Sequence, residues 1–185
     1  MDKKLRNLRP TRVLWVDLEM TSVYPSDDYI LEVAAIVTDW DFKEIASYEG
    51  IIRNKESDIK RRMKTNSDFW DANPDSKEAL LKQNQHGKSS KTIEKELLEF
   101  IDKHFKAGVP VLLAGNSIHV DRRFIIEKWP KLDARLHYRM LDVSAWKVLF
   151  EGKFKTKFIK PDNHRALDDI RGSIQELQYY LAKLK

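Results

Sequence analysis

The stretch VLWVDLEMT, from Val13 to Thr21, decides the fold of this chain. Its first four residues are apolar, which predicts a strand that is buried on both faces. Side chains alternate along a strand, so Asp17 and Glu19 project from the same face, one pleat apart. Two neighbouring acids are costly to bury unless a cation compensates them, and oxygen ligands suit Mg²⁺ or Mn²⁺. A lone D-x-E pair is more often hydrated than metal-bound, so this pair indicates a metal site only if other acids and a base join it.

The composition is that of a soluble globular protein with a bias toward anionic partners. A length of 185 residues, with 42% hydrophobic and 34% charged side chains, predicts a single domain over residues 1–185 with a sizeable core. The net charge of +5 favours an anionic partner such as nucleic acid, although charge alone is weak support. No apolar run reaches the ~18 residues of a membrane span. No cysteine is present for a disulfide or a thiolate zinc site.

The expected location is the cytoplasm. The lack of cysteine fits a reducing compartment, and the basic extension over residues 1–11 lacks the apolar core of a secretory signal. A short mitochondrial presequence is the alternative, against which Asp2 and the absence of serine from this extension argue.

The remaining chain predicts an α/β or α+β layered domain. Strands are expected over residues 13–21, 29–38 and 42–53, the last two joined as a hairpin. The segment from Lys55 to Lys91 is highly charged and broken by Pro74 and Gly87, which predicts short helices, one of them near residues 75–83. Later helices are expected over residues 92–105, 119–129, 143–150 and 165–184, with short strands over 111–114 and 139–142.

Acids that can join the first pair occur at two places later in the chain. Asp121 opens a helix just after a short apolar strand. Asp168 and Asp169 lie in the first turn of the last helix, and His164 precedes it. With Ile170 at the centre of the apolar stripe of that helix, Asp169 lies ~100° away on the flank and Asp168 ~160° away on the outer face. We therefore expect Asp169 at a buried site and Asp168 in solvent or at the helix N-terminus.

The joint pattern is more specific than any of its parts. A D-x-E on the first strand, a mid-chain N-S-x-x-x-D and an H-x-x-x-x-D at the last helix occur in this order. In this pattern the chain resembles the DEDDh 3′–5′ exonucleases of the ribonuclease H-like superfamily, and among them the oligoribonucleases. The residues that carry the closer likeness are 17–21, 115–118, 121–124, 137–139, 141–144 and 168–171.

This resemblance implies an α/β, ribonuclease H-like (DnaQ-like exonuclease) fold, a mixed five-stranded sheet flanked by helices. The charged segment over residues 55–91 would then be a helical insertion near the active site. The resemblance also implies that four acids hold two divalent ions, Mg²⁺ or Mn²⁺: Asp17, Glu19, Asp121 and Asp169. One ion would activate the attacking water and the other would stabilise the leaving 3′-oxygen. His164 would be the general base for that water.

The resemblance further implies a set of substrate-binding residues. Four polar side chains match positions that close around the terminal phosphate of the RNA: Ser117, Tyr138, Arg139 and Ser144. Tyr138 and Arg139 would act in trans, from the partner subunit of a homodimer. Leu18 and Trp70 match residues that wedge and stack the bases, although the residues alone favour Trp70 as a packing side chain. The chain departs from the family pattern at Ser22-Val23 and in the segment after Trp70.

The implied activity is that of a 3′–5′ exoribonuclease. It would hydrolyse RNA of about two to five nucleotides, chiefly dinucleotides, to mononucleoside 5′-phosphates. The alternatives are a DEDDh exonuclease acting on short single-stranded DNA, a catalytically silent nucleic-acid-binding module, and a structural calcium-binding protein. The matches at residues 137–139 and 141–144 favour RNA over DNA. The presence of all four acids and of His164 argues against the silent module. A structural calcium-binding protein would need neither a histidine base nor basic substrate-facing loops.

Overall fold

The computed structural model describes residues 10–159 and 165–184, and its centre is a five-stranded β-sheet. The strands are β1 (Val13–Met20), β2 (Ile30–Thr38), β3 (Glu44–Ile51), β4 (Val111–Gly115) and β5 (Leu136–Asp142). Their order across the sheet is β3-β2-β1-β4-β5, with β2 antiparallel to β1 and β3, and β4 parallel to β1 and β5. The expectation of a mixed five-stranded sheet is therefore confirmed.

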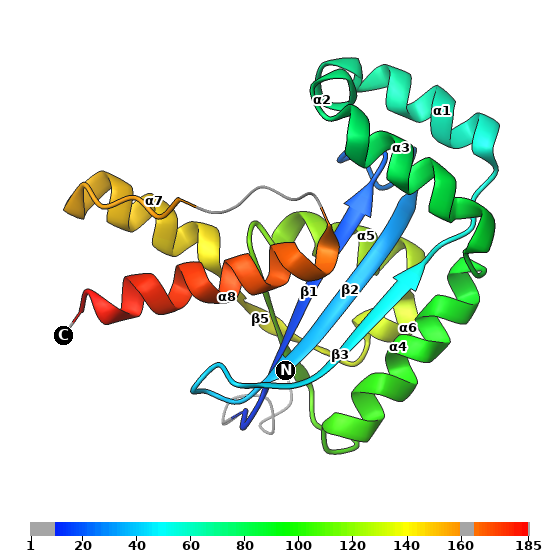
Figure 1. Cartoon of the computed structure of the whole chain (residues 1–185). Helices are drawn as coiled ribbons and strands as arrows, with labels where there is room; N and C mark the ends of the chain where they lie inside the picture. Colours follow the sequence, from blue (N-terminus) through cyan, green and yellow to red (C-terminus); the bar gives the residue numbers. More distant parts are fainter. Residues whose placement is uncertain (1–9, 160–164, 185) are drawn as a thin grey trace.

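β1 lies in the middle of the sheet, and helices cover its apolar run on both faces. On one face α4 (Ser90–His104), α5 (His119–Lys128) and α6 (Pro130–Asp133) pack around Leu14 and Val16. On the other face α7 (Val143–Phe154) and α8 (Ala166–Ala182) pack around Trp15. In Figure 1, α8 lies across β1 and β2, with α5 and α6 on the opposite side of the sheet. Within the two described ranges, no helix is long and apolar enough to cross a membrane.

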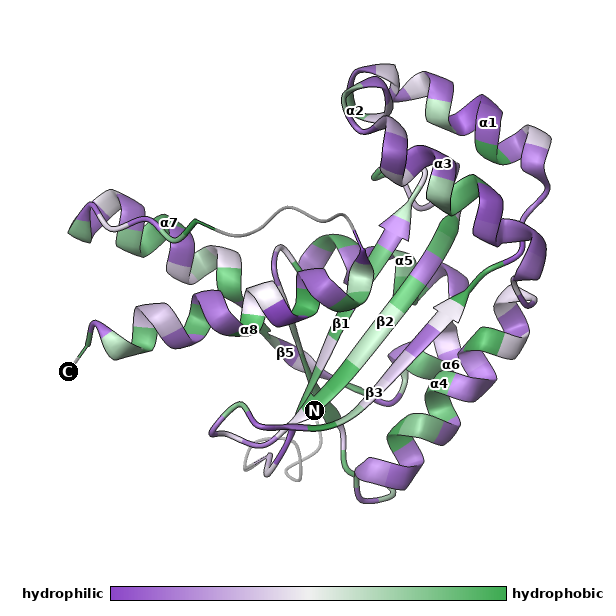
Figure 2. Ribbon diagram, viewed as in Figure 1, coloured by the Kyte–Doolittle hydropathy of each residue, from purple (hydrophilic) through white to green (hydrophobic). Residues whose placement is uncertain are grey.

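The charged segment forms α1 (Glu56–Thr65), α2 (Ser67–Ala72), α3 (Pro74–Gln83) and a 3₁₀ turn, η2 (Asn84–His86). The three α-helices lie beyond the carboxyl end of β1 (Figure 1). α1 is mostly hydrophilic, whereas β2 is mostly hydrophobic (Figure 2). With Leu31 of β2 the three helices enclose a small core of their own, made by Ile59, Met63, Trp70 and Leu80. This satellite core holds the charged segment against the carboxyl end of β1, where Asp17 and Glu19 lie.

The largest extensions beyond the predicted bounds are those of β5 and α7. β5 begins at Leu136 rather than at residue 139, and α7 ends at Phe154 rather than at residue 150. β5 is an edge strand whose residues Tyr138 and Arg139 face solvent, so it lacks the apolar run that marks a buried strand. The last turn of α7 is mostly exposed and shows no apolar period, and the helix ends where Lys155 adopts a left-handed φ of 52°.

Candidate active site

Three carboxylates from two elements meet at the carboxyl end of β1. Asp17 and Glu19 of β1 and Asp169 of α8 each offer one oxygen, and these oxygens lie within 4.8 Å of one another. They meet because α8 packs on the sheet face from which both β1 acids project. Asp168 is exposed and lies 3.9 Å from the Arg171 guanidinium, as the helical wheel predicts for the outer of the two aspartates. Clustered carboxylate oxygens suit a hard divalent cation, so this donor set fits Mg²⁺ or Mn²⁺.

Burial and mutual repulsion make Glu19 bind a proton when no cation compensates the cluster. The pKa of Glu19 rises to about 8, chiefly because its carboxylate loses solvation. The charges of Asp169, Glu32 and Asp121 raise this pKa further. The guanidinium of Arg165 lowers it. A cation that binds at the cluster has to displace this proton.

We expect the stability of the metal-free protein to fall as the pH rises through about 8. The Glu19 carboxyl has an ordinary pKa of 4.5 and a pKa of about 8 in the fold, so the folded state binds this proton more tightly than the unfolded chain. Its contribution to stability is therefore complete below pH 4.5 and lost as the pH rises through 8. Added Mg²⁺ competes with the proton, and should raise the melting temperature more at high pH than at low pH.

The measurement is the melting temperature from about pH 6 to about pH 9, in EDTA and in Mg²⁺. Glu19→Gln is the matched control, because it keeps the shape of the side chain and removes the titrating group. If Glu19→Gln and the wild type show the same pH dependence in EDTA, the proton is bound elsewhere and this reading of Glu19 fails.

Asp121, the fourth predicted ligand, is buried beside the backbone of Leu18. It lies in the first turn of α5, and its Oδ1 accepts a 2.9 Å hydrogen bond from the Leu18 N–H. Burial raises the pKa of Asp121, and this hydrogen bond opposes the rise. Its charge acts on Glu19, but its oxygens are not part of the group that lies within 4.8 Å. Asp121 therefore stands on the flank of the acid cluster.

His164, the predicted general base, lies outside the residues that the structure describes. The described chain resumes at Arg165, whose carbonyl oxygen accepts a 2.9 Å hydrogen bond from the Asp169 N–H. The sequence position of the predicted base thus directly precedes the turn that carries Asp169.

A hydroxyl-rich corner lies at the carboxyl end of β4, next to β1. The Ser117 N–H donates to Asp142 Oδ1 at 3.0 Å and to Ser144 Oγ at 2.8 Å, and the two serine hydroxyls lie 2.8 Å apart. Ser144 Oγ also donates to Asn116 Oδ1. The turn holds Ser117 in a left-handed conformation with a φ of 50°. Because β4 is parallel to β1, this group of hydroxyls lies at the same carboxyl end of the strands as Asp17.

Tyr138 and Arg139 lie on β5, far from the acids of the same chain. The Arg139 guanidinium stands 5.4 Å from the centre of the Tyr138 ring, and Tyr138 is 51% exposed. The strand register places Met140 level with Leu14. Arg139 is therefore about 13 Å from Asp17 along the strands and about 10 Å across them. The structure does not bring these two residues to the acid cluster.

The two candidates for base contacts, Leu18 and Trp70, are both buried. Trp70 is 1% exposed, and its indole N–H donates to the Thr21 carbonyl at 2.8 Å, which ties α2 to the end of β1. In this conformation Trp70 packs, as the residues alone predict, and no face of its indole is open to a base. The exposed ring of α2 is that of Phe69, 39% exposed and edge-on to Trp70 at a ring distance of 5.0 Å.

Glu32 lies beside the acid cluster, although no role was predicted for it. The pattern of β2 predicts an apolar strand and assigns no role to its one acid. In the structure Glu32 pairs directly across from Glu19, and its side chain is 2% exposed. An acid within an otherwise apolar strand, ILEVAAIVT, is the signal that points to such a residue, because a carboxylate is not buried without compensation.

Proteins of known sequence match nearly the whole of this chain. The family model described as Exonuclease matches residues 14–177. The oligoribonuclease of Francisella tularensis subsp. novicida is 40% identical over 175 residues, which cover 93% of this chain and 95% of that protein. A probable oligoribonuclease of Dictyostelium discoideum is 36% identical over 179 residues, which cover 94% of this chain and 90% of that protein.

Solved structures of exonuclease I share the fold. The enzyme from Methylocaldum szegediense gives a TM-score of 0.59 at 13% identity, covering 94% of this chain and 41% of that one. A zinc-bound complex of E. coli exonuclease I with single-stranded DNA gives 0.61 at 12% identity, covering 95% and 41%. This chain thus spans less than half of those chains, and the likeness shows the fold alone. The family model and the two relatives show that this chain belongs to the exonuclease family of nucleases and, within it, to the oligoribonucleases.

Proposed function

We propose that this protein is a metal-dependent 3′–5′ exoribonuclease that hydrolyses short oligoribonucleotides, above all dinucleotides, to mononucleoside 5′-phosphates. The observation that carries the proposal is the meeting of Asp17, Glu19 and Asp169, whose oxygens lie within 4.8 Å of one another. Relatives that are named oligoribonuclease and match more than nine tenths of the chain support short RNA as the substrate.

The acid cluster is the place where the metal would be held. Asp17, Glu19 and Asp169 supply the ligand oxygens, and Asp121 adds a fourth carboxylate from the flank. Two divalent ions bound there would activate a water molecule and stabilise the leaving 3′-oxygen. His164 takes the proton from that water as the general base, for which a pKa near neutrality is suited.

Tyr138 and Arg139 serve the active site of a partner subunit in a homodimer. Their distance from the acids of their own chain supports this arrangement, as does their exposure on an edge strand. His137 Nε2 is buried and has no hydrogen-bond partner among the described residues, which fits a contact supplied by a second chain. Apolar side chains of α7, the helix that follows β5, are also exposed: Val148, Leu149 and Phe154.

Four side chains would form a cap around the 5′-phosphate of a dinucleotide: Ser117 and Ser144 of one subunit and the partner's Tyr138 and Arg139. Such a phosphate cap favours the shortest substrate. Contacts to a doubly charged terminal phosphate are stronger than contacts to a bridging diester. Each added nucleotide has to leave through the cap and gives up those contacts. An open groove behaves oppositely, since longer strands gain stacking and phosphate contacts.

The cap predicts a length preference that depends on the 5′-phosphate. Single-turnover rates and affinities should be highest for 5′-phosphorylated two-mers, lower for three-, five- and ten-mers, and sharply lower for two-mers without the phosphate. Arg139→Ala should flatten this preference more than it slows hydrolysis of bound substrate. Arg171→Ala, which removes an exposed arginine of α8, is the control and should leave the preference unchanged. Ten-mers that bind as tightly as two-mers, with no effect of the phosphate, mean that the cap is absent.

A DNA exonuclease is the second candidate. The observation in its favour is the shared fold with E. coli exonuclease I, which has been solved in complex with a DNA oligonucleotide. That likeness stands at 13% identity and shows the fold alone, whereas the oligoribonucleases match at 36–40% over nearly the whole chain. RNA is therefore the proposed substrate, and DNA is the parallel arm of the test.

A further inference from the structure

Glu32 is a buried carboxylate one strand away from the acid cluster. Its side chain is 2% exposed, and its partner across β1 and β2 is Glu19. A buried acid beside another acid destabilises the fold unless a positive group and hydrogen bonds compensate it.

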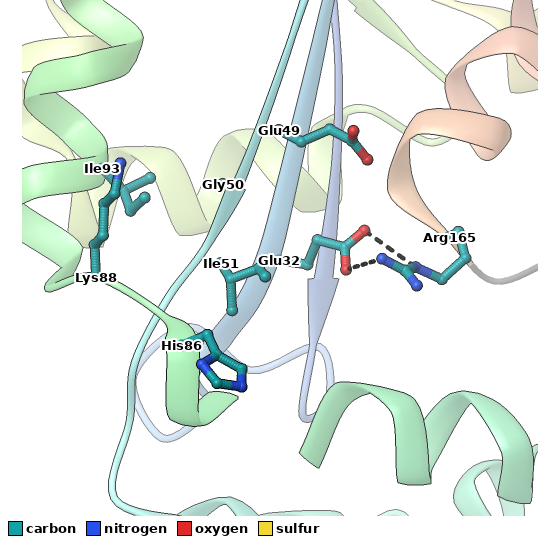
Figure 3. Close-up of a pocket in the computed structure, with 8 residues that line it drawn as sticks. All are labelled: Glu32, Glu49, Gly50, Ile51, His86, Lys88, Ile93 and Arg165. Carbon is teal, nitrogen blue, oxygen red and sulfur yellow. Dashed lines mark hydrogen bonds and ion pairs between the residues drawn. The ribbon is translucent and has the colours of Figure 1, made fainter. Parts of the chain in front are cut away.

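Arg165 and Gln83 compensate Glu32 and also bond to each other. Arg165 Nη2 and Nε donate to the two Glu32 carboxylate oxygens at 3.1 and 3.4 Å (Figure 3). Gln83 Nε2 donates to Glu32 Oε2 at 2.5 Å, and Gln83 Oε1 accepts from Arg165 Nη2 at 3.3 Å. This closed network, the Glu32–Arg165–Gln83 clamp, joins β2 to the end of α3 and the start of α8.

The end of α3 is itself fixed to the sheet. The side chain of Asn84, next to Gln83, accepts from the Asn54 N–H at 2.8 Å and donates to the Asn54 carbonyl at 2.9 Å. Asn54 Nδ2 donates in turn to the Ile30 carbonyl of β2 at 2.8 Å. Gln83 is therefore a rigid partner for the guanidinium of Arg165.

The start of α8 depends on Arg165 because the helix lacks a side-chain cap. Arg165 is the N-cap residue, and its side chain accepts no hydrogen bond from the first turn. Its carbonyl accepts the Asp169 N–H at 2.9 Å, which closes that turn. The position of Arg165 thereby sets where Asp169 stands relative to Asp17 and Glu19.

We propose that Arg165 is a positioning residue of the metal site: anchored by Glu32 and Gln83, it holds the first turn of α8 so that Asp169 stays within ligand distance of the β1 acids. The inference rests on the proposed function, which gives the cluster its metal. Through Gln83, Arg165 also couples α3, within the charged segment, to the carboxyl end of β1 where the acids lie.

Loss of Arg165 should change metal affinity in opposite directions, depending on whether Arg165 only compensates charge or also positions Asp169. The Arg165 side chain is 44% exposed and places a positive charge near a cluster that would bind cations. If that charge were its whole role, its removal would strengthen the attraction of a divalent ion. If Arg165 positions Asp169, its removal weakens binding instead, because one ligand is no longer held in place.

The test is Mn²⁺ affinity by titration calorimetry, with kcat and KM for an RNA dinucleotide measured on the same proteins. Arg165→Ala should bind Mn²⁺ about tenfold more weakly, and lose about tenfold in kcat at saturating Mn²⁺ with little change in KM. Arg165→Lys keeps the charge but cannot bridge both Glu32 oxygens and Gln83, so it should fall between Ala and wild type. Arg165 borders a cavity of about 330 Å³ (Figure 3), so a smaller side chain meets no steric obstacle.

Arg171→Ala is the matched control. Arg171 also lies on α8, is also 44% exposed, and bonds to both oxygens of Glu44 at 3.2 Å. Its loss removes the same charge, and in the first turn it breaks an exposed 3.9 Å ion pair with Asp168, which offers no oxygen to the acid cluster. This variant should leave Mn²⁺ affinity and kcat within about twofold of wild type. Mn²⁺ binding in Arg165→Ala that equals or exceeds the wild type overturns the proposal, as does an equal loss in Arg171→Ala.

Two further outcomes are distinguished. If Arg165→Ala does not fold, Arg165→Lys and Gln83→Ala decide, and wild-type Mn²⁺ affinity in both overturns the proposal. The calorimetric measurement needs no substrate. A wild type that binds Mn²⁺ but cleaves no RNA therefore refutes the proposed function while the clamp is still tested.

Discussion

Asp169→Ala is expected to abolish RNA hydrolysis, whereas Asp168→Ala should keep most of it. The two aspartates are adjacent, but only Asp169 offers an oxygen within 4.8 Å of those of Asp17 and Glu19. Without it the ions that we propose for the cluster would be misplaced and the remaining acids would repel each other, so we expect a loss of about a thousandfold or more in kcat/KM. The measurement is kcat/KM for an RNA dinucleotide in Mn²⁺, with melting temperatures to show that both variants fold.

His164→Ala separates metal binding from proton transfer in the same experiment. Asp169→Ala should weaken Mn²⁺ binding by calorimetry, while His164→Ala should bind Mn²⁺ normally and lose orders of magnitude in rate. Equal and complete losses in Asp168→Ala and Asp169→Ala would refute the assignment of Asp169. Loss of Mn²⁺ binding in His164→Ala would refute the general-base role.

Activity is expected to return when two inactive variants are mixed. In the proposed arrangement, Tyr138→Ala would lack the residue that reaches the partner's site, and Asp121→Ala would lack a carboxylate beside its own acid cluster. In a mixed dimer, the Tyr138→Ala subunit keeps its acids and receives an intact tyrosine from the partner. After random exchange half of the dimers are mixed and each has one complete site, so about a quarter of the wild-type activity should appear.

The measurement is dinucleotide hydrolysis after the two variants are mixed under conditions that exchange subunits. Exchange is verified with differently tagged chains, and each variant incubated alone is the control. Recovery that scales with the mixed dimer supports a site shared between subunits. No recovery despite verified exchange would show that Tyr138 acts within its own chain or not at all.

The burial of the first strand on both faces and the helix face of Asp169 could be predicted from the sequence because both follow from the local residue pattern. The apolar run before Asp17 predicts a strand that is buried on both faces, and residues 13–16 are buried in the cores on the two sides of the sheet. The stripe around Ile170 separates Asp169 from Asp168 by angle alone, and the structure places the two as that angle requires. These features depend on local spacing, which a single sequence displays directly.

The features that the sequence could not supply depend on pairing between distant segments. Glu32 faces Glu19 only because of the register between β1 and β2, and no local pattern reveals that register. The residues alone predict that Trp70 packs, but they do not reveal its partners in the satellite core, Ile59, Met63 and Leu80. The clamp joins Gln83 to Arg165 across 82 positions of the chain.

The most direct test of the central claim is the digestion of a 5′-labelled RNA pentamer in Mn²⁺, beside a DNA pentamer of the same sequence and an EDTA control. A metal-dependent 3′–5′ exoribonuclease predicts stepwise shortening from the 3′ end, release of mononucleoside 5′-phosphates, slower cleavage of DNA and none in EDTA. Shortening that persists in EDTA, immediate release of the labelled 5′ nucleotide, or faster cleavage of DNA than of RNA would contradict the account.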